Sequence, residues 1–499
     1  MSDPLMQPRL DHLASLRERG IDPFPARVPQ AQPIGPIHLR HADLASEATS
    51  GEHVTVAGRV MAMRKMGKAS FLDLRDGTGR IQGHATLDRM GEDAYANLKG
   101  TDIGDFLAVS GEVFRTKRGE LTVAVEHFDF LSKAIRPLPE KWHGLKDVEQ
   151  RHRHRSLDLI ANDDVRDAFI ARSRMISRIR RTLDDAGFLE IETPTLQPQA
   201  GGAMARPFVC HHNALDIDLY MRIALELYLK RVLIGGLDRV YEIGKCFRNE
   251  GVSTEHNPEF TMLEVYQAYA DYGTMMDLTE RLISDACDAV GIEDRIVTFR
   301  GHQIDLSTPF QRLPMRDAIR EATGIDVSSM DPNAIDQDAS AQGIELPDGS
   351  AGKKVEALFE RFVEPTLIHP TFITDYPIEI SPLAKRQADD DRWVERFELF
   401  VGGGLELANA FSELNDPIDQ RERFEAQERL RSAGDEEAQR VDEDFLFAME
   451  HGMPPAGGLG IGIDRVAMLL TGPDSIREVI LFPTLRERKT DPTRGEGES

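Results

Sequence analysis

Apolar and polar residues follow one another with two different periods along this chain. From Val54 to about Leu131, apolar residues take every second position in short runs, which turns such as Asp76-Gly77 and Arg118-Gly119 separate. This alternation is typical of short strands, and strands at such spacing predict a small β-barrel. Beyond residue 150, helical patterns such as Val165 to Ala186 alternate with strand-like runs. The second region is therefore predicted to be a large mixed domain of the α+β class.

Changes of pattern set the predicted domain boundaries. Before the barrel, a short amphipathic stretch, Leu10 to Arg19, precedes a proline-rich linker. Within the large domain, a charged helical stretch at about 307–370 reads as an insertion. The predicted divisions are a helical extension and linker at 1–50, the barrel at 51–135, a hinge at 136–150, the large domain at 151–485 and a disordered tail at 486–499.

Two strand-like runs, residues 239–250 and 260–266, flank a polar turn and predict a long hairpin. Because alternate residues of a strand share a face, Arg248 is predicted to lie beside Glu250 on one strand, with Phe260 on the other. A guanidinium can bind a phosphate, a carboxylate can accept from an amino group, and a phenyl ring can stack on a base. The hairpin is therefore suited to a nucleotide, although a surface hairpin with incidental charges would show the same residues.

A glycine-rich run at residues 457–462 leads through Arg465 into an apolar, helix-like segment. Glycines let a strand pass close to a ligand, and a strand-to-helix junction is a suitable place for a phosphate. Two arginines from distant segments, Arg248 and Arg465, suggest the two ends of a bent triphosphate. Dinucleotide-fold and P-loop motifs do not fit: the third glycine is misplaced here, and Gly352-Lys353-Lys354 lacks the first glycine and the Ser or Thr.

These segments resemble the class II aminoacyl-tRNA synthetases, and within them the bacterial-type lysyl-tRNA synthetases of class IIb. The resemblance extends from about residue 10 to about residue 485. Class motifs 1, 2 and 3 correspond to residues 174–194, 239–264 and 458–465, and the segments typical of lysine enzymes are 201–208, 211–216 and 411–416. The resemblance implies an N-terminal OB-fold β-barrel and a class II catalytic domain with a mostly antiparallel sheet flanked by helices. It also implies the activation of L-lysine with ATP to lysyl-adenylate and its transfer to the 3′ end of tRNA(Lys).

The resemblance also implies roles at the ATP site. Arg248 and Arg465 would be the catalytic groups, gripping the α-phosphate with the substrate carboxylate and the γ-phosphate respectively. No covalent nucleophile is needed, because oriented cations stabilise the charge that develops. Phe260 would stack on adenine, Glu250 would accept from its amino group, and the turn would be lined by His256 and Asn257.

Glu398 and Glu406 would hold Mg²⁺ on the phosphates, since hard cations take oxygen ligands. Here the chain departs from the family pattern. The segment Val401 to Gly404 contains one residue more than usual between the two acids. A bulge could absorb it, or the register of the pair could shift. Solvated acids beside a glycine hairpin are the alternative interpretation.

A buried ammonium group requires carboxylate partners, so a lysine pocket should contain several acids. By resemblance Glu413 and Tyr266 would take the ε-ammonium, and Asn409 the carboxylate side. The other residues assigned to lysine are Gly201 and Glu226 at the α-amino group, Phe411 on the face of Asn409, and Glu264, whose role is open. Two further departures are Leu225, where the family usually has proline, and Glu255, at a position that is often basic. Either could lower activity or loosen selectivity.

An OB-fold binds single-stranded RNA by stacking bases on aromatic rings and following the backbone with cations. By resemblance Arg64, Phe71 and Gln82 would bind the middle uridine of the anticodon. A core phenylalanine with two solvated neighbours is the alternative. The formal net charge of -25 requires tRNA to bind at local basic patches, for which 64–68 and 115–118 are candidates.

Other features limit location and assembly. No apolar run approaches the roughly 18 residues of a membrane helix, and no signal peptide is evident, which predicts a cytoplasmic protein. Three scattered cysteines predict free thiols. Motif 1 predicts an isologous homodimer.

Two other functions remain to be weighed against a synthetase. The first is a catalytically weakened, synthetase-like RNA-binding or regulatory protein, which Leu225 and the extra glycine motivate. Retention of Arg248 and Arg465 argues against it. The second is a paralogue that lysylates a protein or a lipid, but such relatives lack the barrel or carry membrane helices.

Overall fold

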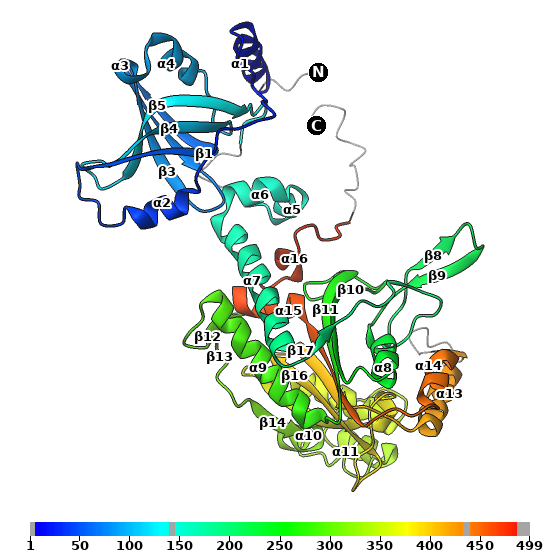
Figure 1. Cartoon of the computed structure of the whole chain (residues 1–499). Helices are drawn as coiled ribbons and strands as arrows, with labels where there is room; N and C mark the ends of the chain where they lie inside the picture. The colour runs from blue at the N-terminus through cyan, green and yellow to red at the C-terminus, as the bar shows by residue number, and fades with distance from the viewer. Residues whose placement is uncertain (1–4, 139–144, 433–439, 487–499) are drawn as a thin grey trace, which may run out of the picture. The chain divides into compact units, whose positions relative to one another are not determined.

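A computed structural model of the chain describes residues 5–138, 145–432 and 440–486. The chain divides into two compact units, Met1–Gly144 and Leu145–Ser499 (Figure 1). The predicted tail lies outside the described residues after Arg486, and so does the middle of the predicted hinge, residues 139–144.

The first unit is a closed five-stranded barrel in the order β1-β2-β3-β5-β4. Its alternating sequence places every second side chain inside, as Val54, Val56, Leu72 and Leu74 show. The OB-fold prediction is thereby confirmed. The elements of this unit are α1 (Gln7–Glu18), α2 (Ile34–Arg40), β1 (Thr49–Met66), β2 (Ala69–Arg75), β3 (Arg80–Thr86), α3 (Leu87–Met90), α4 (Glu92–Lys99), β4 (Phe106–Arg115) and β5 (Leu121–Ser132).

The second unit is built on an eight-stranded sheet in the order β14-β15-β16-β17-β18-β11-β10-β6. Only its two outer pairs, β14 with β15 and β10 with β6, are parallel. The predicted mostly antiparallel sheet is therefore confirmed. Its strands are β6 (Leu189–Glu190), β10 (Arg239–Phe247), β11 (Glu259–Ala268), β14 (Gln311–Pro314), β15 (Thr371–Pro377), β16 (Trp393–Val401), β17 (Leu405–Ser412) and β18 (Ala456–Gly462).

Helices cover the two faces of this sheet differently. One face packs against α7 (Asp163–Asp185), α9 (Tyr272–Val290) and α15 (Ile463–Thr471) and holds the largest apolar core. Strand residues such as Val240 and Tyr266 point to the other face, where α8 (Glu226–Ile234), α13 (Pro417–Ser432) and α14 (Glu443–Met449) contribute to a smaller core. This second face remains open over its middle strands.

Helix α9 shows how the sequence sets an element's ends. The Asp271 side chain accepts a hydrogen bond from Thr274 N at 2.8 Å, which caps the first turn, and Gly291 ends the helix in the left-handed region at φ 82°. Between them the buried residues recur at helical spacing, as Met275, Thr279 and Ile283 do.

The region predicted as an insertion has its own apolar core, formed around α10 (Met315–Thr323), α11 (Pro332–Ala341) and α12 (Ala351–Phe362). Its first strand, β14, belongs to the main sheet. The remaining elements are α5 (Val148–Arg153), α6 (Arg155–Ala161), β7 (Leu196–Gln197), β8 (Val209–His212), β9 (Ile217–Met221), β12 (Ile296–Phe299), β13 (His302–Asp305), two short 3-10 turns (Glu364–Thr366 and Ile378–Ile380) and α16 (Ile476–Val479). The three cysteines are unpaired.

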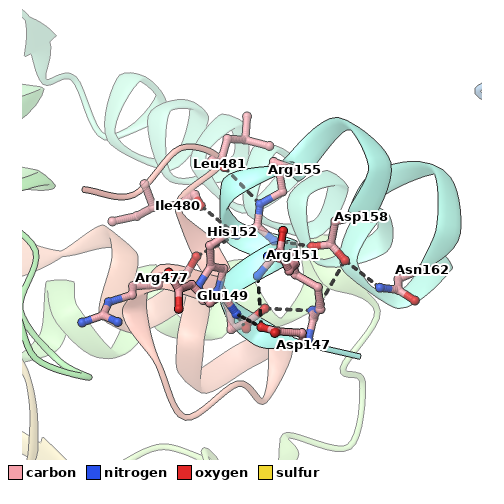
Figure 2. A network of polar contacts seen from close by, with 12 residues as sticks. Asp147, Glu149, Arg151, His152, Arg155, Asp158, Asn162, Arg477, Ile480 and Leu481 are labelled. Atoms are coloured by element: carbon pink, nitrogen blue, oxygen red, sulfur yellow. Dashed lines mark hydrogen bonds and ion pairs between the residues drawn. The ribbon is translucent and has the colours of Figure 1, made fainter. Parts of the chain in front are cut away.

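A buried polar network joins α5 and α6 to the segment around α16 (Figure 2). Arg155 is 1% exposed; it donates to Asp158 Oδ2 at 2.6 Å and to the Leu481 carbonyl at 3.0 Å. An unpaired buried charge is costly, so Arg155 stays paired with Asp158. Its second bond, to the Leu481 carbonyl, holds the C-terminal segment against α6. The same segment donates Ile476 N–H to the Thr254 carbonyl at 2.7 Å. It thereby supports the loop between β10 and β11.

Candidate active site

A cavity of about 320 Å³ lies over the open face of the sheet, on β11, β17 and β18. Residues of the β10–β11 loop and of the segment 380–384 complete its wall. Of the residues predicted for ATP, lysine and metal, those that line it are Glu226, Arg248, Glu250, His256, Asn257, Phe260, Glu264, Tyr266, Glu406, Asn409, Phe411 and Arg465. The remaining three, Gly201, Glu398 and Glu413, do not.

The hairpin differs from its prediction at one end. Strand β10 ends at Phe247, so Arg248 and Glu250 lie in the loop instead of on the strand. Arg248 N–H still donates across the hairpin to the Pro258 carbonyl at 2.9 Å, and Asn249 N–H then turns away to the Arg206 carbonyl at 2.7 Å. Arg248 still reaches the cavity, with its guanidinium 5.1 Å from the centre of the Phe260 ring. Among the described residues, its buried Nε has no hydrogen-bond partner.

Arg465 lies in the first turn of α15, as the glycine-rich run predicts. Its Nη1 donates to the Glu406 carbonyl at 2.8 Å and to Glu406 Oε2 at 3.0 Å. Its Nη2 lies 3.4 Å from His256 Nε2. Burial and the charge of Arg465 lower the pKa of His256. The helix start is fixed by buried Asp464, which accepts from Thr261 N at 2.7 Å.

Strand β17 contains an irregularity between the two predicted metal ligands. The register changes from Leu399 opposite Ala408 to Phe400 opposite Glu406, which leaves Leu407 as a one-residue bulge. Residues 406 and 409 are an odd number of positions apart, and a regular strand would send them to opposite faces. With the bulge, Glu406 lies on the cavity side with Asn409.

Glu398 lies beneath the cavity on β16, opposite Asn409. It accepts from Arg396 Nη2 at 2.5 Å and from the Tyr376 hydroxyl at 2.9 Å. Burial raises the pKa of Glu398, and the charge of Glu406 adds to this. Burial and the acids around it raise the pKa of nearby Glu364 to about 7.

This acidic surplus fits a hard cation, although no group of three or more His, Cys, Asp or Glu side chains in the described part of the chain is arranged to hold a metal. Two carboxylates suffice for Mg²⁺ only if phosphate oxygens and water complete its coordination.

The predicted lysine pocket is a group of buried acids at the closed end of the cavity. Glu264 accepts from the Tyr266 hydroxyl and from Leu225 N–H, both at 2.9 Å. Proline, the usual family residue at position 225, has no N–H to give. The departure therefore supplies a donor to a buried carboxylate. Burial and the charge of Glu226 raise the pKa of Glu264 to about 7.

Glu413 follows β17 and is 1% exposed. Its Oε1 has no hydrogen-bond partner among the described residues and lies against Gly458, where an added Cβ would approach it to 1.9 Å. Gly458 itself lines the cavity. Because glycine has no side chain, only the backbone of Gly458 lies between the Glu413 carboxylate and the cavity.

Sequence reasoning missed two cations at this site. Lys230 on α8 pairs with Glu226 at 2.5 Å and also with Glu413. The four-residue spacing of Glu226 and Lys230 on a predicted helix was the available signal. Arg396 donates to Asn409 Oδ1 at 3.1 Å, which only the pairing of β16 with β17 reveals.

The surroundings of one predicted lysine-site residue, Gly201, and of one family departure, Glu255, are simple. Gly201 itself is covered by Leu227, and its neighbour Gly202, at φ 87°, lines the cavity in its place. Glu255 forms an ion pair with Arg300.

The three predicted anticodon residues share the outer face of the barrel. Arg64 is the cross-strand partner of Phe71, and its guanidinium lies 5.9 Å from the ring centre. Phe71 is half-buried and stacks on His84 with ring centres 4.5 Å apart, whereas Leu72 beside it is fully buried. Gln82 lies on the neighbouring strand, opposite Asp73.

Comparison with known proteins agrees with these features. Residues 147–486 match the model for tRNA synthetases class II (D, K and N), and residues 54–131 match that for the OB-fold nucleic acid binding domain. The chain is 54% identical to the lysine–tRNA ligase of Moorella thermoacetica, over 97% of this chain and 98% of that protein. It is 53% identical to the lysine–tRNA ligase of Carboxydothermus hydrogenoformans, over 97% and 98%, and 52% identical to that of Bacillus subtilis strain 168, over 97% of each.

The fold, the motif segments and these matches define one class: the chain belongs to the class II tRNA synthetases of the aspartate, lysine and asparagine group. Within that group it belongs to the lysine–tRNA ligases. Its activity is the ATP-dependent activation of lysine and its transfer to tRNA, and nothing favours the regulatory alternative. Across the described residues, every helix is too short or too polar to span a membrane.

Proposed function

We propose that the cavity over β11, β17 and β18 is where L-lysine and ATP meet. The observation that carries the proposal is that Arg248 and Arg465, more than 200 positions apart in sequence, line one cavity that also contains buried acids. Two cations can hold a bent triphosphate, and buried carboxylates can hold an ammonium. The joint presence of both devices favours amino-acid activation over simple nucleotide binding.

Arg248 would hold the α-phosphate beside the lysine carboxylate, and Arg465 the γ-phosphate. An unpartnered buried Nε on Arg248 supports this, because a guanidinium has donors available for an oxyanion. Phe260 would stack on adenine and Glu250 would accept from the adenine amino group, while His256 and Asn257 line the loop. Reaction would follow from alignment and charge stabilisation by these groups.

Glu398 and Glu406 would hold Mg²⁺, which would neutralise phosphate charge when bound. The bulge at Leu407 supports this because it turns Glu406 toward the cavity. Arg465, which pairs with Glu406, would keep that carboxylate in place.

At the closed end, Glu413 and Tyr266 would take the ε-ammonium, and Glu226 with the segment at Gly201 the α-amino group. Asn409 and Phe411 would border the substrate on the β17 side. Glu264 accepts a hydrogen bond from the Tyr266 hydroxyl and would act on the substrate through that tyrosine.

ATP–pyrophosphate exchange tests the pocket assignment directly. The expected result is exchange with lysine, weaker exchange with ornithine, whose chain is one methylene shorter, and none with aspartate or asparagine, whose side chains offer no cation to the acids. Exchange with aspartate at the level of lysine would overturn the assignment of Glu413.

Phe71 provides a separate test of the barrel as an anticodon reader. Phe71→Ala is expected to raise the KM for tRNA in aminoacylation by about 5- to 100-fold, because base stacking contributes about 1–3 kcal/mol. Exchange without tRNA should not change. Phe24→Ala, which removes an exposed ring before the barrel, is the matched control. An unchanged KM for tRNA in Phe71→Ala would contradict the assignment of Arg64, Phe71 and Gln82.

A homodimer in the cytoplasm completes the proposal. Strand β6, in the motif 1 segment, is an edge strand of the large sheet, and its Leu189 is 51% exposed. An unpaired strand edge with an exposed apolar side chain is suited to contact with a second copy.

A further inference from the structure

Lys230 is a fully buried cation that lies behind the cavity and does not line it. Its ammonium contacts Glu226 Oε1 at 2.5 Å and Glu413 Oε2, and so joins a residue of α8 to one that follows β17. The ring centres of Phe411 and Phe445 lie 5.2 and 6.0 Å from the same nitrogen. Such complete burial of an ammonium requires compensation by opposite charge.

Every element packed around this ammonium can be accounted for. Helix α8 contributes Glu226, β11 contributes Glu264 and Tyr266, and the segment after β17 contributes Glu413. The uncharged rings are Phe411 of β17 and Phe445 of α14. Three carboxylates thus surround one resident cation. The group therefore has a surplus of negative charge when its acids are ionised, and an incoming cation can satisfy that surplus.

Lys230 uses only part of this acid group. Its ion pair with Glu413 is to Oε2, whereas Oε1 forms no ion pair among the described residues and lies against Gly458 at the cavity wall; neither oxygen has a regular hydrogen bond there. The resident cation therefore fixes the direction of the carboxylate and leaves its second oxygen for another donor.

We propose that Lys230 is a positioning residue for amino-acid selection: its ammonium ties Glu226 to Glu413 and holds the Glu413 carboxylate turned toward the substrate ammonium. The inference rests on the proposed lysine pocket. Lys230 acts through the two acids and does not touch the substrate.

The electrostatics agree with this role. Burial and the charges of Glu226 and Glu264 raise the pKa of Glu413, and Lys230 is the cation that opposes the rise. Without Lys230, the pKa of Glu413 would rise further, and the carboxyl would be protonated over a wider range of pH. A protonated carboxyl binds an ammonium poorly. Lysine affinity in a charge-deleted variant should therefore improve as pH increases through the raised pKa.

The test is Lys230→Met, which keeps an unbranched side chain as far as Cε and removes the ammonium group with its charge. In lysine-dependent ATP–pyrophosphate exchange, we expect the KM for lysine at pH 7 to rise about 10- to 100-fold, with the KM for ATP within about twofold of wild type. Between pH 6.5 and 8.5, the ratio of variant to wild-type KM should fall as pH rises. Comparison at each pH cancels the titration of lysine's own amino groups.

Lys354→Met is the matched control, because Lys354 is also a buried, ion-paired lysine of the second unit but belongs to α12. It should lose stability and keep the KM for lysine at all pH values. Lys230→Arg restores the charge. Its ratio of variant to wild-type KM for lysine should therefore stay constant between pH 6.5 and 8.5. If Lys230→Met does not fold, Lys230→Gln replaces it, since it keeps a donor without the charge.

Two outcomes are distinguishable. If Glu413→Gln raises the KM for lysine but Lys230→Met or Lys230→Gln shows the wild-type KM and pH profile, the role of Lys230 is overturned and the pocket stands. If Glu413→Gln itself leaves the KM unchanged, the proposed pocket fails.

Discussion

Arg248→Ala is expected to reduce lysine-dependent ATP–pyrophosphate exchange by about 10³-fold or more while the protein remains folded. The guanidinium lies at the start of the β10–β11 loop, stacked against Phe260, and its Nε has no partner among the described residues. Removing it therefore breaks no internal ion pair that a fold would need. It removes the group proposed to align two anions and to stabilise the charge of the transition state, and one such donor contributes about 10²- to 10³-fold. A second contribution comes from lost alignment.

Two further variants separate charge from geometry. Arg248→Lys keeps the charge but cannot make two parallel hydrogen bonds, so an intermediate loss is expected. Arg239→Ala, at the other end of β10, removes an exposed arginine that bonds to the Ala186 carbonyl and should leave exchange unchanged. Circular dichroism and urea unfolding would confirm that all three fold. Exchange within tenfold of wild type in Arg248→Ala would contradict the assignment.

The sequence predicted those parts of the fold that depend on local periodicity. The alternation of Val54 and Val56 defines the inside of the barrel. Residues 262–266 of β11 alternate between cavity and core because successive side chains of a strand point to opposite faces. Helix ends such as Asp271 and Gly291 are likewise local chemistry.

Features that depend on contacts between distant segments could not be predicted in this way. Strand β10 ends at Phe247, and two residues later Asn249 turns to the Arg206 carbonyl, which lies more than 40 positions earlier. The bulge at Leu407 is visible only in the register of β16 with β17. Lys230 meets Glu413 because α8, which packs against β10 and β11, also lies beside the segment after β17.

Family departures also acquire a physical meaning only in three dimensions. From the sequence, the absence of proline at position 225 is interpreted as a change that could lower activity or loosen selectivity. The structure shows instead a donor to Glu264, which is a contact with a different acid on a different strand. A substitution that looks like a loss in sequence can therefore add a hydrogen bond to the same site.

Glu413→Gln is the second change with a large expected effect. The side chain is buried, its Oε1 faces the cavity wall at Gly458, and its Oε2 pairs with Lys230. An amide of the same shape removes the charge that would hold the ε-ammonium, and loss of one partner of a buried charge pair costs about 2–5 kcal/mol. We therefore expect the KM for lysine to rise about 100-fold or more, with the KM for ATP nearly unchanged.

Selectivity provides a sharper test of the same variant. Loss of the charge should weaken the binding of lysine and leave norleucine, an analogue with the same four side-chain carbons and no ammonium group, unaffected. The ratio of exchange rates for the two amino acids should therefore fall by about the factor by which the KM rises. Glu242→Gln is the matched control, since Glu242 is a buried glutamate of the same sheet that pairs with Arg222 at 2.5 Å and does not line the cavity. Glu242→Gln should lower the stability of the protein without changing the ratio of exchange rates for lysine and norleucine. An unchanged ratio in Glu413→Gln would show that the ammonium of lysine is recognised by other groups.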